Sequence, residues 1–212
     1  MLRILTYFVV GLLSQPLLAQ NPGQNIAVDV QIASIMRIAD TMGVSYVVNV
    51  LAPSTEQFGR FSVDAPGGVL RIATPTPATD WASSTDFDGR PLAHWVGGLI
   101  SAGSSTPELH FDGVGLPGIL TYWVGVFQLP SLEEPDSSPR PDPLQAEMIS
   151  GQTVGIEPWP VDRTAQALIA RLRNLTQRTC TTPLFWISSS ALCNDLLSQL
   201  DQGIIPVEWA TR

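Results

Sequence analysis

The sequence predicts a mainly β protein with a small α-helical unit near its C-terminal end. Three observations carry this prediction. Short stretches with alternating apolar side chains recur about every ten residues in the first part of the chain. The 18 prolines and 17 glycines, in a chain that is 44% hydrophobic and 14% charged, indicate many turns between short strands. Further along, apolar residues recur at helical spacing instead. The β part, residues 25–129, is expected to be an antiparallel β-sandwich or a barrel-like sheet.

The first 19 residues are expected to be a signal peptide. Arg3 precedes an apolar run, residues 4–13, which is too short to span a bilayer. A break at residues 14–16 and the small Ala19 then indicate cleavage after Ala19, with an uncleaved anchor as the alternative. No later run reaches the roughly 18 apolar residues of a transmembrane helix. The mature chain is therefore expected in the periplasm or outside the cell, without spanning a membrane.

Four strands are predicted in order, at residues 26–32, 44–51, 58–63 and 69–73. The first alternates apolar with polar or small side chains, which is typical of a half-buried strand, and the second places Val44, Tyr46, Val48 and Val50 on one face. The last two are expected to pair as a hairpin, because Pro66 and Gly67 between them favour a tight turn. Strands at this spacing favour an antiparallel sheet or sandwich.

A loop is expected at residues 74–86, and two Phe-Asp-Gly stretches follow it, at residues 87–89 and 111–113. Each stretch suits a turn, since the aspartate can bond its own backbone and glycine accepts a positive φ. Each is followed by Trp-Val-Gly, so Trp95 and Trp123 are expected in the core. Residues 119–129 are apolar on both faces, which predicts a central strand at the end of the β part.

The rest of the chain changes character. Residues 130–146 combine prolines with acidic residues and predict a linker or a long exposed loop. Residues 147–212 are expected to form a helical unit that packs on the β domain. Its first helix should run from Asp162 to about Arg178, and its second from Ser190 to Gln202, each with one apolar stripe.

Cys180 and Cys193 are the two cysteines of the chain. An even number of cysteines in an exported protein predicts a disulfide, here between the end of the first helix and the second helix. Closing a loop of this length stabilises the fold by about 3 kcal/mol in the chain-entropy model. The spacing fits neither a CxxC redox pair nor a zinc site.

The charge balance disfavours two classes of partner. The chain has 11 basic and 19 acidic residues and a formal net charge of −8. Such a protein repels phosphate backbones, so nucleic-acid binding is not expected. Anionic membrane surfaces are disfavoured for the same reason.

No catalytic residue is assigned from the sequence. The two histidines, His94 and His110, lie in strand-like segments, and no G-x-S-x-G motif is present. Asp88 and Asp112 occupy equivalent places in the two Phe-Asp-Gly stretches and are expected to bond the backbone of their turns. The alternative is that these four residues form a hydrolase site, because glycoside hydrolysis uses carboxyl groups about 5–10 Å apart.

Metal and ligand sites are equally sparse. Asp80, Asp86 and Asp88 could hold a weakly bound calcium ion, but the EF-hand pattern fails, so no cofactor is expected. Trp81 and Trp159 lie in predicted loops beside acidic residues. Exposed aromatic rings in such places can stack on sugars or peptides, so these two are the candidate ligand-binding residues, with a protein or carbohydrate partner.

The function favoured by these observations is an exported, non-enzymatic binding or assembly module of the periplasm or cell surface. One alternative is a secreted, glycosidase-like hydrolase that uses the carboxylates of the two Phe-Asp-Gly stretches. Another is a structural subunit that assembles through a β edge strand, for which the strand at residues 25–32 is the candidate.

Overall fold

The computed structural model describes residues 26–38, 40–75, 80–87, 90–126, 148–181, 184 and 186–202, with the backbone alone of Phe87. The predicted signal peptide and the predicted linker at residues 130–146 lie outside this part. The chain divides into two compact units, one ending at Pro158 and one beginning at Trp159, and each is described by itself.

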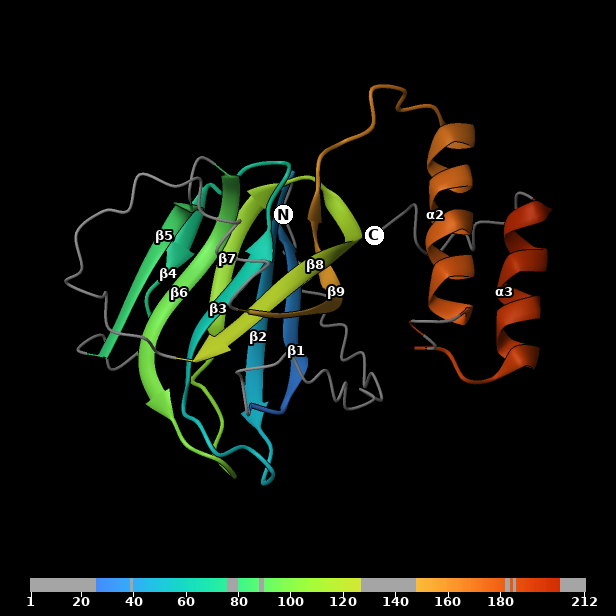
Figure 1. Ribbon diagram of the computed structural model, residues 1–212. Coiled ribbons are helices and arrows are strands. Elements are labelled where there is room, and N and C mark those ends of the chain that lie inside the picture. The colour runs from blue at the N-terminus through green and yellow to red at the C-terminus, as the bar shows by residue number, and fades with distance from the viewer. Residues whose placement is uncertain are drawn as a thin grey trace, which may run out of the picture. The chain divides into compact units, whose positions relative to one another are not determined.

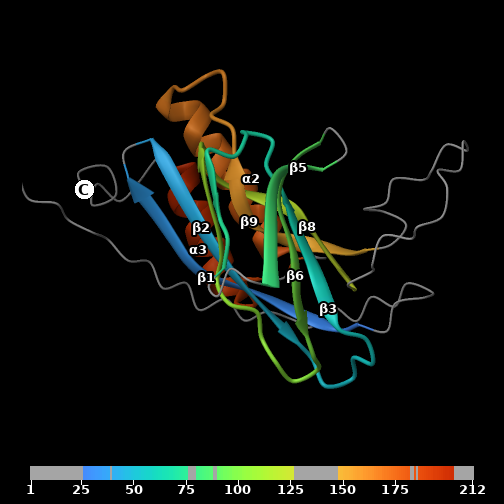
Figure 2. The same ribbon diagram turned by 90° about the vertical axis from the view of Figure 1, so that its left-hand side faces the viewer.

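The first unit consists of two antiparallel sheets (Figures 1 and 2). One sheet has the strand order β1-β2-β7-β4 and the other the order β5-β6-β3-β8-β9. The described strands are β1 (Val28–Ile38), β2 (Thr41–Val50), β3 (Phe58–Asp64), β4 (Arg71–Ala73), β5 (Trp81–Phe87), β6 (Arg90–Ile100), β7 (Leu109–Val114), β8 (Leu116–Val126) and β9 (Ile149–Glu157). The predicted mainly β, sandwich-like fold is confirmed, and the sheets do not close into a barrel.

The core lies between the two sheets and is formed by alternate residues of their strands, such as Val44, Tyr46 and Val48 of β2. Its centre is aromatic. Phe61 on β3 lies among three other aromatic rings. The distance between ring centroids is 5.4 Å to Tyr46 on β2, 5.8 Å to Trp95 on β6 and 6.1 Å to Tyr122 on β8. Burial raises the pKa of Tyr46 far above its usual value. Its phenol therefore stays protonated and donates a hydrogen bond to the Val154 carbonyl at 2.8 Å.

The predicted hairpin between the third and fourth strands is wrong. β3 pairs with β6 and β8, whereas β4 pairs with β7 in the other sheet. A turn does form between them, with Gly68 N–H donating to the Ala65 carbonyl and Gly68 at φ +82°. This turn carries the chain from one sheet to the other instead of folding it back on its own sheet.

Two other local predictions fail. The predicted loop at residues 74–86 contains β5, whose edge position tolerates the polar run that suggested a loop. Phe111, Asp112 and Gly113 lie inside β7 and form no turn. At Gly113 a Cβ would come within 2.9 Å of the Gly68 carbonyl oxygen, so the glycine serves a close backbone approach. Trp95 and Trp123 are buried, as predicted.

The β unit also extends further than predicted. Residues 149–157 form β9, which pairs with β8 from Leu116↔Glu157 to Val124↔Ile149. The sequence predicts that they belong to the helical unit at residues 147–212, because they follow the proline-rich acidic segment. Their continuous antiparallel pairing with β8 identifies them as a strand.

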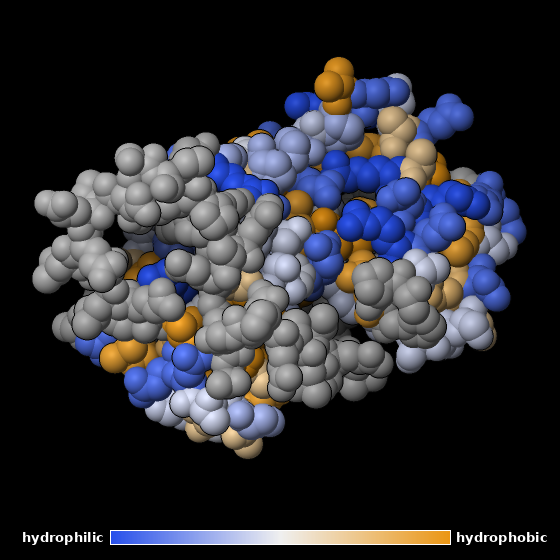
Figure 3. All heavy atoms as spheres, viewed as in Figure 1, coloured by the Kyte–Doolittle hydropathy of each residue, from blue (hydrophilic) through white to orange (hydrophobic). Residues whose placement is uncertain are grey.

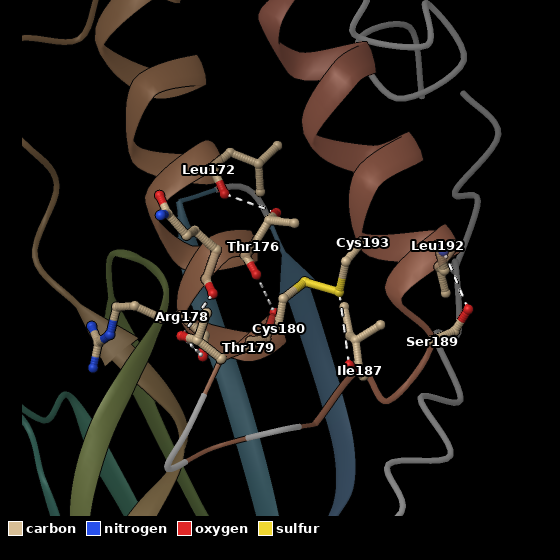
Figure 4. Close-up of a disulfide and its surroundings, with 11 residues drawn as sticks. Leu172, Thr176, Arg178, Thr179, Cys180, Ile187, Ser189, Leu192 and Cys193 are labelled. Atoms are coloured by element: carbon tan, nitrogen blue, oxygen red, sulfur yellow. Dashed lines mark hydrogen bonds between the residues drawn. A yellow bond between two sulfur atoms is a disulfide. The ribbon is translucent and has the colours of Figure 1, made fainter.

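The second unit contains α2 (Ala165–Cys180) and α3 (Ser190–Asp201), which confirms both predicted helices. Thr164 and Ser189 are the N-caps, and their hydroxyl oxygens accept from the N–H groups of Ala167 and Leu192. The predicted disulfide joins Cys180 to Cys193 with a Cα–Cα distance of 6.0 Å (Figure 4). No helix in the described ranges is long and apolar enough to cross a membrane.

Candidate functional site

A polar cluster lies on the outer face of the four-stranded sheet. Ser45 Oγ is 2.8 Å from His110 Nδ1, and His110 Nε2 is 2.9 Å from Asp112 Oδ1. Arg71 Nε donates to Asp112 Oδ2 at 3.0 Å. The strand register sets these contacts, because Ser45 is opposite His110 on β2 and β7, and Arg71 is opposite Asp112 on β4 and β7. Three strands that are distant in sequence thus supply one hydrogen-bonded chain.

Strand alternation explains why the cluster faces outward. Val44 and Tyr46 on β2 and Phe111 on β7 belong to the core, so their neighbours Ser45, His110 and Asp112 point to the other face. Gly43 makes room for them. A Cβ at Gly43 would come within 2.7 Å of Asp112 Oδ1 and 2.8 Å of His110 Cε1. The cluster therefore lies close to the backbone of β2.

The geometry resembles a Ser-His-Asp triad but does not present a nucleophile. A carboxylate only accepts hydrogen bonds, so His110 Nε2 carries the proton and donates to Asp112. In the neutral ring, Nδ1 then accepts from the Ser45 hydroxyl. A serine and a carboxylate on the two ring nitrogens is also the arrangement of a working triad, so the burial of Ser45 is what separates this cluster from one. The cluster orients Asp112 and Arg71 at the surface, whereas the Ser45 hydroxyl is shielded from solvent.

A second serine–histidine pair lies in the other sheet. Ser62 Oγ is 2.6 Å from His94 Nδ1, and both residues are buried. Burial, and after it the charge of Arg60, lowers the pKa of His94 to about 4. His94 and His110 are on different sheets, so the two histidine-containing segments do not meet in one site. This outcome fits the expectation that each histidine is a strand residue.

The buried His94 predicts that the β unit loses stability in acid. Its pKa is lowered from 6.5 in the unfolded chain, so the folded state binds fewer protons and stability falls as pH drops from 6.5 towards 4. We expect a loss on the order of 2 kcal/mol, because Ser62 can still accept from the protonated ring and offset part of the penalty. Urea denaturation of the wild type and of His94→Gln at pH 7 and pH 4.5 measures this loss. Equal pH dependence in both proteins would contradict the prediction.

The other predicted site residues are not brought together. Asp88 lies outside the described residues, so its distance from Asp112 is not defined. Asp86 is opposite Pro91 on the edge strand β5, and Asp80 immediately precedes this strand. Among the residues that the structure describes, no group of three His, Cys, Asp or Glu side chains could hold a metal ion. The calcium alternative therefore gains no support from Asp80 and Asp86.

The expectation of an exposed Trp81 is wrong. Trp81 is the first residue of β5, is 8% exposed and lies 6.4 Å from the Phe58 ring. Gly98 makes room for the indole, because a Cβ there would come within 2.1 Å of Trp81 Cζ2. Trp159 is half-buried, and the Arg163 guanidinium lies 5.3 Å from its ring centroid. A ligand role for Trp159 stays a prediction.

The outer edge of β1 is the candidate interaction site. Within the described part of the chain, β1 is hydrogen-bonded to β2 alone. Backbone hydrogen bonds show which residues of β2 face β1 and which face away from it. Val48 and Val50 bond to residues 103–106, on the side away from β1, whereas Leu51 N–H donates to the Ala27 carbonyl. Because these directions alternate along a strand, Asp29 and Gln31 bond to β2.

Three residues of β1 consequently direct their N–H and C=O groups away from β2: Val28, Val30 and Ile32. Val28 belongs to the core, and Val30 and Ile32 are partly buried against it. The run ends where the pairing register shifts between Ile32 and Ser34. We call residues 28–32 the open edge.

Exposed apolar residues continue beyond this edge. Met36 and Ile38 of β1 lie opposite Gly43 and Thr41, and Thr41 in turn lies opposite Val114 of β7. All three apolar side chains are exposed. On the face shown in Figure 3, hydrophobic residues form small patches among hydrophilic ones. The open edge differs from scattered apolar surface because it combines two features. Its backbone groups point away from β2 and pair with no other described strand, and a half-buried apolar row runs along it.

Sequence reasoning missed Ser45 and Arg71. Alternation in β2 was visible, so Ser45 could be placed on the polar face of its strand. Its partner could not be found, because the pairing of β2 with β7 joins segments 65 residues apart. Comparison with known proteins adds nothing to the site, since no family model, curated protein or solved structure matches the chain.

Proposed function

We propose that this protein is an exported, non-enzymatic module that binds or assembles with another polypeptide by strand addition at the open edge. The observation that carries the proposal is the combination of outward backbone groups and a half-buried apolar row along residues 28–32. An extended segment laid along this edge would pair with the backbone and cover Val30 and Ile32. Strand addition of this kind needs neither a nucleophile nor a metal.

Export is supported by two independent features. The N-terminal segment has the charge, apolar length and small residue of a signal peptide. The Cys180–Cys193 disulfide fits an oxidising compartment. A secreted hydrolase is the weaker alternative. His110 and Asp112 do meet, but Ser45, the serine that they contact, is fully buried.

Site-specific photo-crosslinking in the cell that makes the protein tests the proposal. A benzoylphenylalanine at Gln31, an exposed position of the open edge, is expected to give a crosslinked polypeptide adduct. The matched control is Ala82, an exposed residue of β5 at the edge of the other sheet, where no adduct is expected. Absence of an adduct at Gln31, or equal adducts at both positions, would overturn the proposal.

A further inference from the structure

We infer that the polypeptide added at the open edge is the open edge of a second copy of this chain, paired antiparallel about a two-fold axis at Val30. This inference rests on the proposed function and specifies its partner. It follows from which backbone groups point outward, from the side chains that would meet, and from the place where the strand becomes irregular.

The backbone of residues 28–32 is self-complementary. A two-fold axis at Val30 places Val30 opposite Val30 of the second copy and Val28 opposite its Ile32. All of these residues direct their N–H and C=O groups outward. Each pair of opposed residues would therefore be a hydrogen-bonded pair, in which the two residues exchange two backbone hydrogen bonds as in an ordinary antiparallel sheet. Centring the axis on Val30 uses all three outward residues, and the two four-stranded sheets would join into one.

The core-facing side chains also match. Val28, Val30 and Ile32 lie on the inner face of the strand, and Val30 and Ile32 remain partly exposed there. Directly opposite residues in an antiparallel pair point to the same face. In the dimer, these β-branched side chains would therefore pack on one another and lose their remaining contact with water.

The outer face supplies complementary polar groups. The same axis places Asp29 opposite Gln31 of the second copy, and Gln31 opposite its Asp29. Within one chain, Gln31 Nε2 already donates a hydrogen bond to Asp29 Oδ2 at 2.7 Å, so the amide and the carboxylate can form the same bond between two copies. No like charges face each other across the axis. The Asp29 carboxylate of each copy can therefore accept from the Gln31 amide of the other copy without bringing like charges together.

The register shift between Ile32 and Ser34 limits the contact. Beyond it the phase of the strand changes, so the ladder cannot continue along the whole of β1. A contact restricted to residues 28–32 is small compared with stable dimer interfaces. The dimer is accordingly expected to be weak and dependent on protein concentration.

Charge substitutions at Gln31 test the pairing. Sedimentation velocity of the mature protein over a range of concentrations should show a monomer–dimer equilibrium. Gln31→Lys would face Asp29 of the second copy and should tighten the dimer about fivefold, whereas Gln31→Glu should weaken it by about the same factor. Both effects should shrink at high salt. Shifts in the same direction, or a wild type that stays monomeric at every concentration, would overturn the inference.

Two further variants separate pairing from misfolding. Val30→Pro removes an N–H that points away from β2, so the monomer should keep its circular dichroism spectrum while the dimer is lost. Val30→Cys should form a disulfide-linked dimer on oxidation, because opposed residues of a hydrogen-bonded pair have Cα atoms about 5.5 Å apart, which a disulfide can span. Ala82→Cys is the control, and equal crosslinking there would overturn the inference. A crosslink at Gln31 to a different protein would support the proposed function while contradicting self-pairing.

Discussion

Replacing Phe61 with alanine is expected to lower the free energy of unfolding of the β unit by about 4 kcal/mol, within the range seen for buried phenylalanines. Phe61 is fully buried and lies within 5.4–6.1 Å, between ring centroids, of Tyr46, Trp95 and Tyr122. These three rings come from both sheets. Alanine would leave a cavity between the sheets that rigid aromatic neighbours cannot easily fill, and would also remove the favourable ring–ring contacts.

Urea denaturation followed by near-UV circular dichroism measures this effect, because the signal reports aromatic packing. Leu70→Ala is the matched control. Leu70 is 63% exposed, so its truncation should change the unfolding free energy by less than about 1 kcal/mol. A Phe61→Ala cost no larger than that of Leu70→Ala would show that the aromatic cluster does not hold the two sheets together.

The elements that the sequence predicted well are those whose signal is local. The helix expected at residues 190–202 is α3, Ser190–Asp201, because Ser189 caps it and its apolar spacing is regular. The alternation in residues 44–51 identified β2 for the same reason. The even number of cysteines in a chain expected to be exported predicts the disulfide that joins Cys180 to Cys193.

The predictions that failed depended on long-range pairing. The turn at Pro66 and Gly67 exists, but a turn alone does not decide whether its flanking strands pair with each other or enter different sheets. Asp112 shows the same limit. Phe-Asp-Gly suits a turn, yet the pairing of β7 with both β2 and β4 keeps it extended. Tertiary pairing outweighed local turn preference at both places.

The outer-face cluster could be predicted only in part. His110 and Asp112 are two residues apart, so strand alternation alone places them on one face once β7 is recognised as a strand. Ser45 and Arg71 join them through the registers of β2 and β4. Register depends on the packing of the whole sandwich, so no local pattern at Ser45 or Arg71 indicates their shared role.

Removing the disulfide with the double substitution Cys180→Ser and Cys193→Ser is expected to unfold the helical unit while the β unit stays folded. The crosslink spans 13 residues and should contribute about 3 kcal/mol. Few buried side chains in the helical unit could compensate for the loss of the disulfide. α2 contains no buried residue, and the described part of α3 buries only Cys193 and Leu200. A cavity of about 280 Å³ also lies between the helices beside the disulfide, lined in part by Gln177, Ile187 and Leu197.

Hydrogen exchange resolved by peptide distinguishes the two units. In the double variant, amides in α2 and α3 should exchange at nearly the rate of an unfolded chain, while amides of β2 and β8 should keep their protection. Ser188→Ala, beside the disulfide but leaving it intact, is the control and should keep the helices protected. Protected helices in the double variant would show that the Arg173–Asp201 ion pair and the α2–α3 contact suffice, and that so small a unit folds without its crosslink.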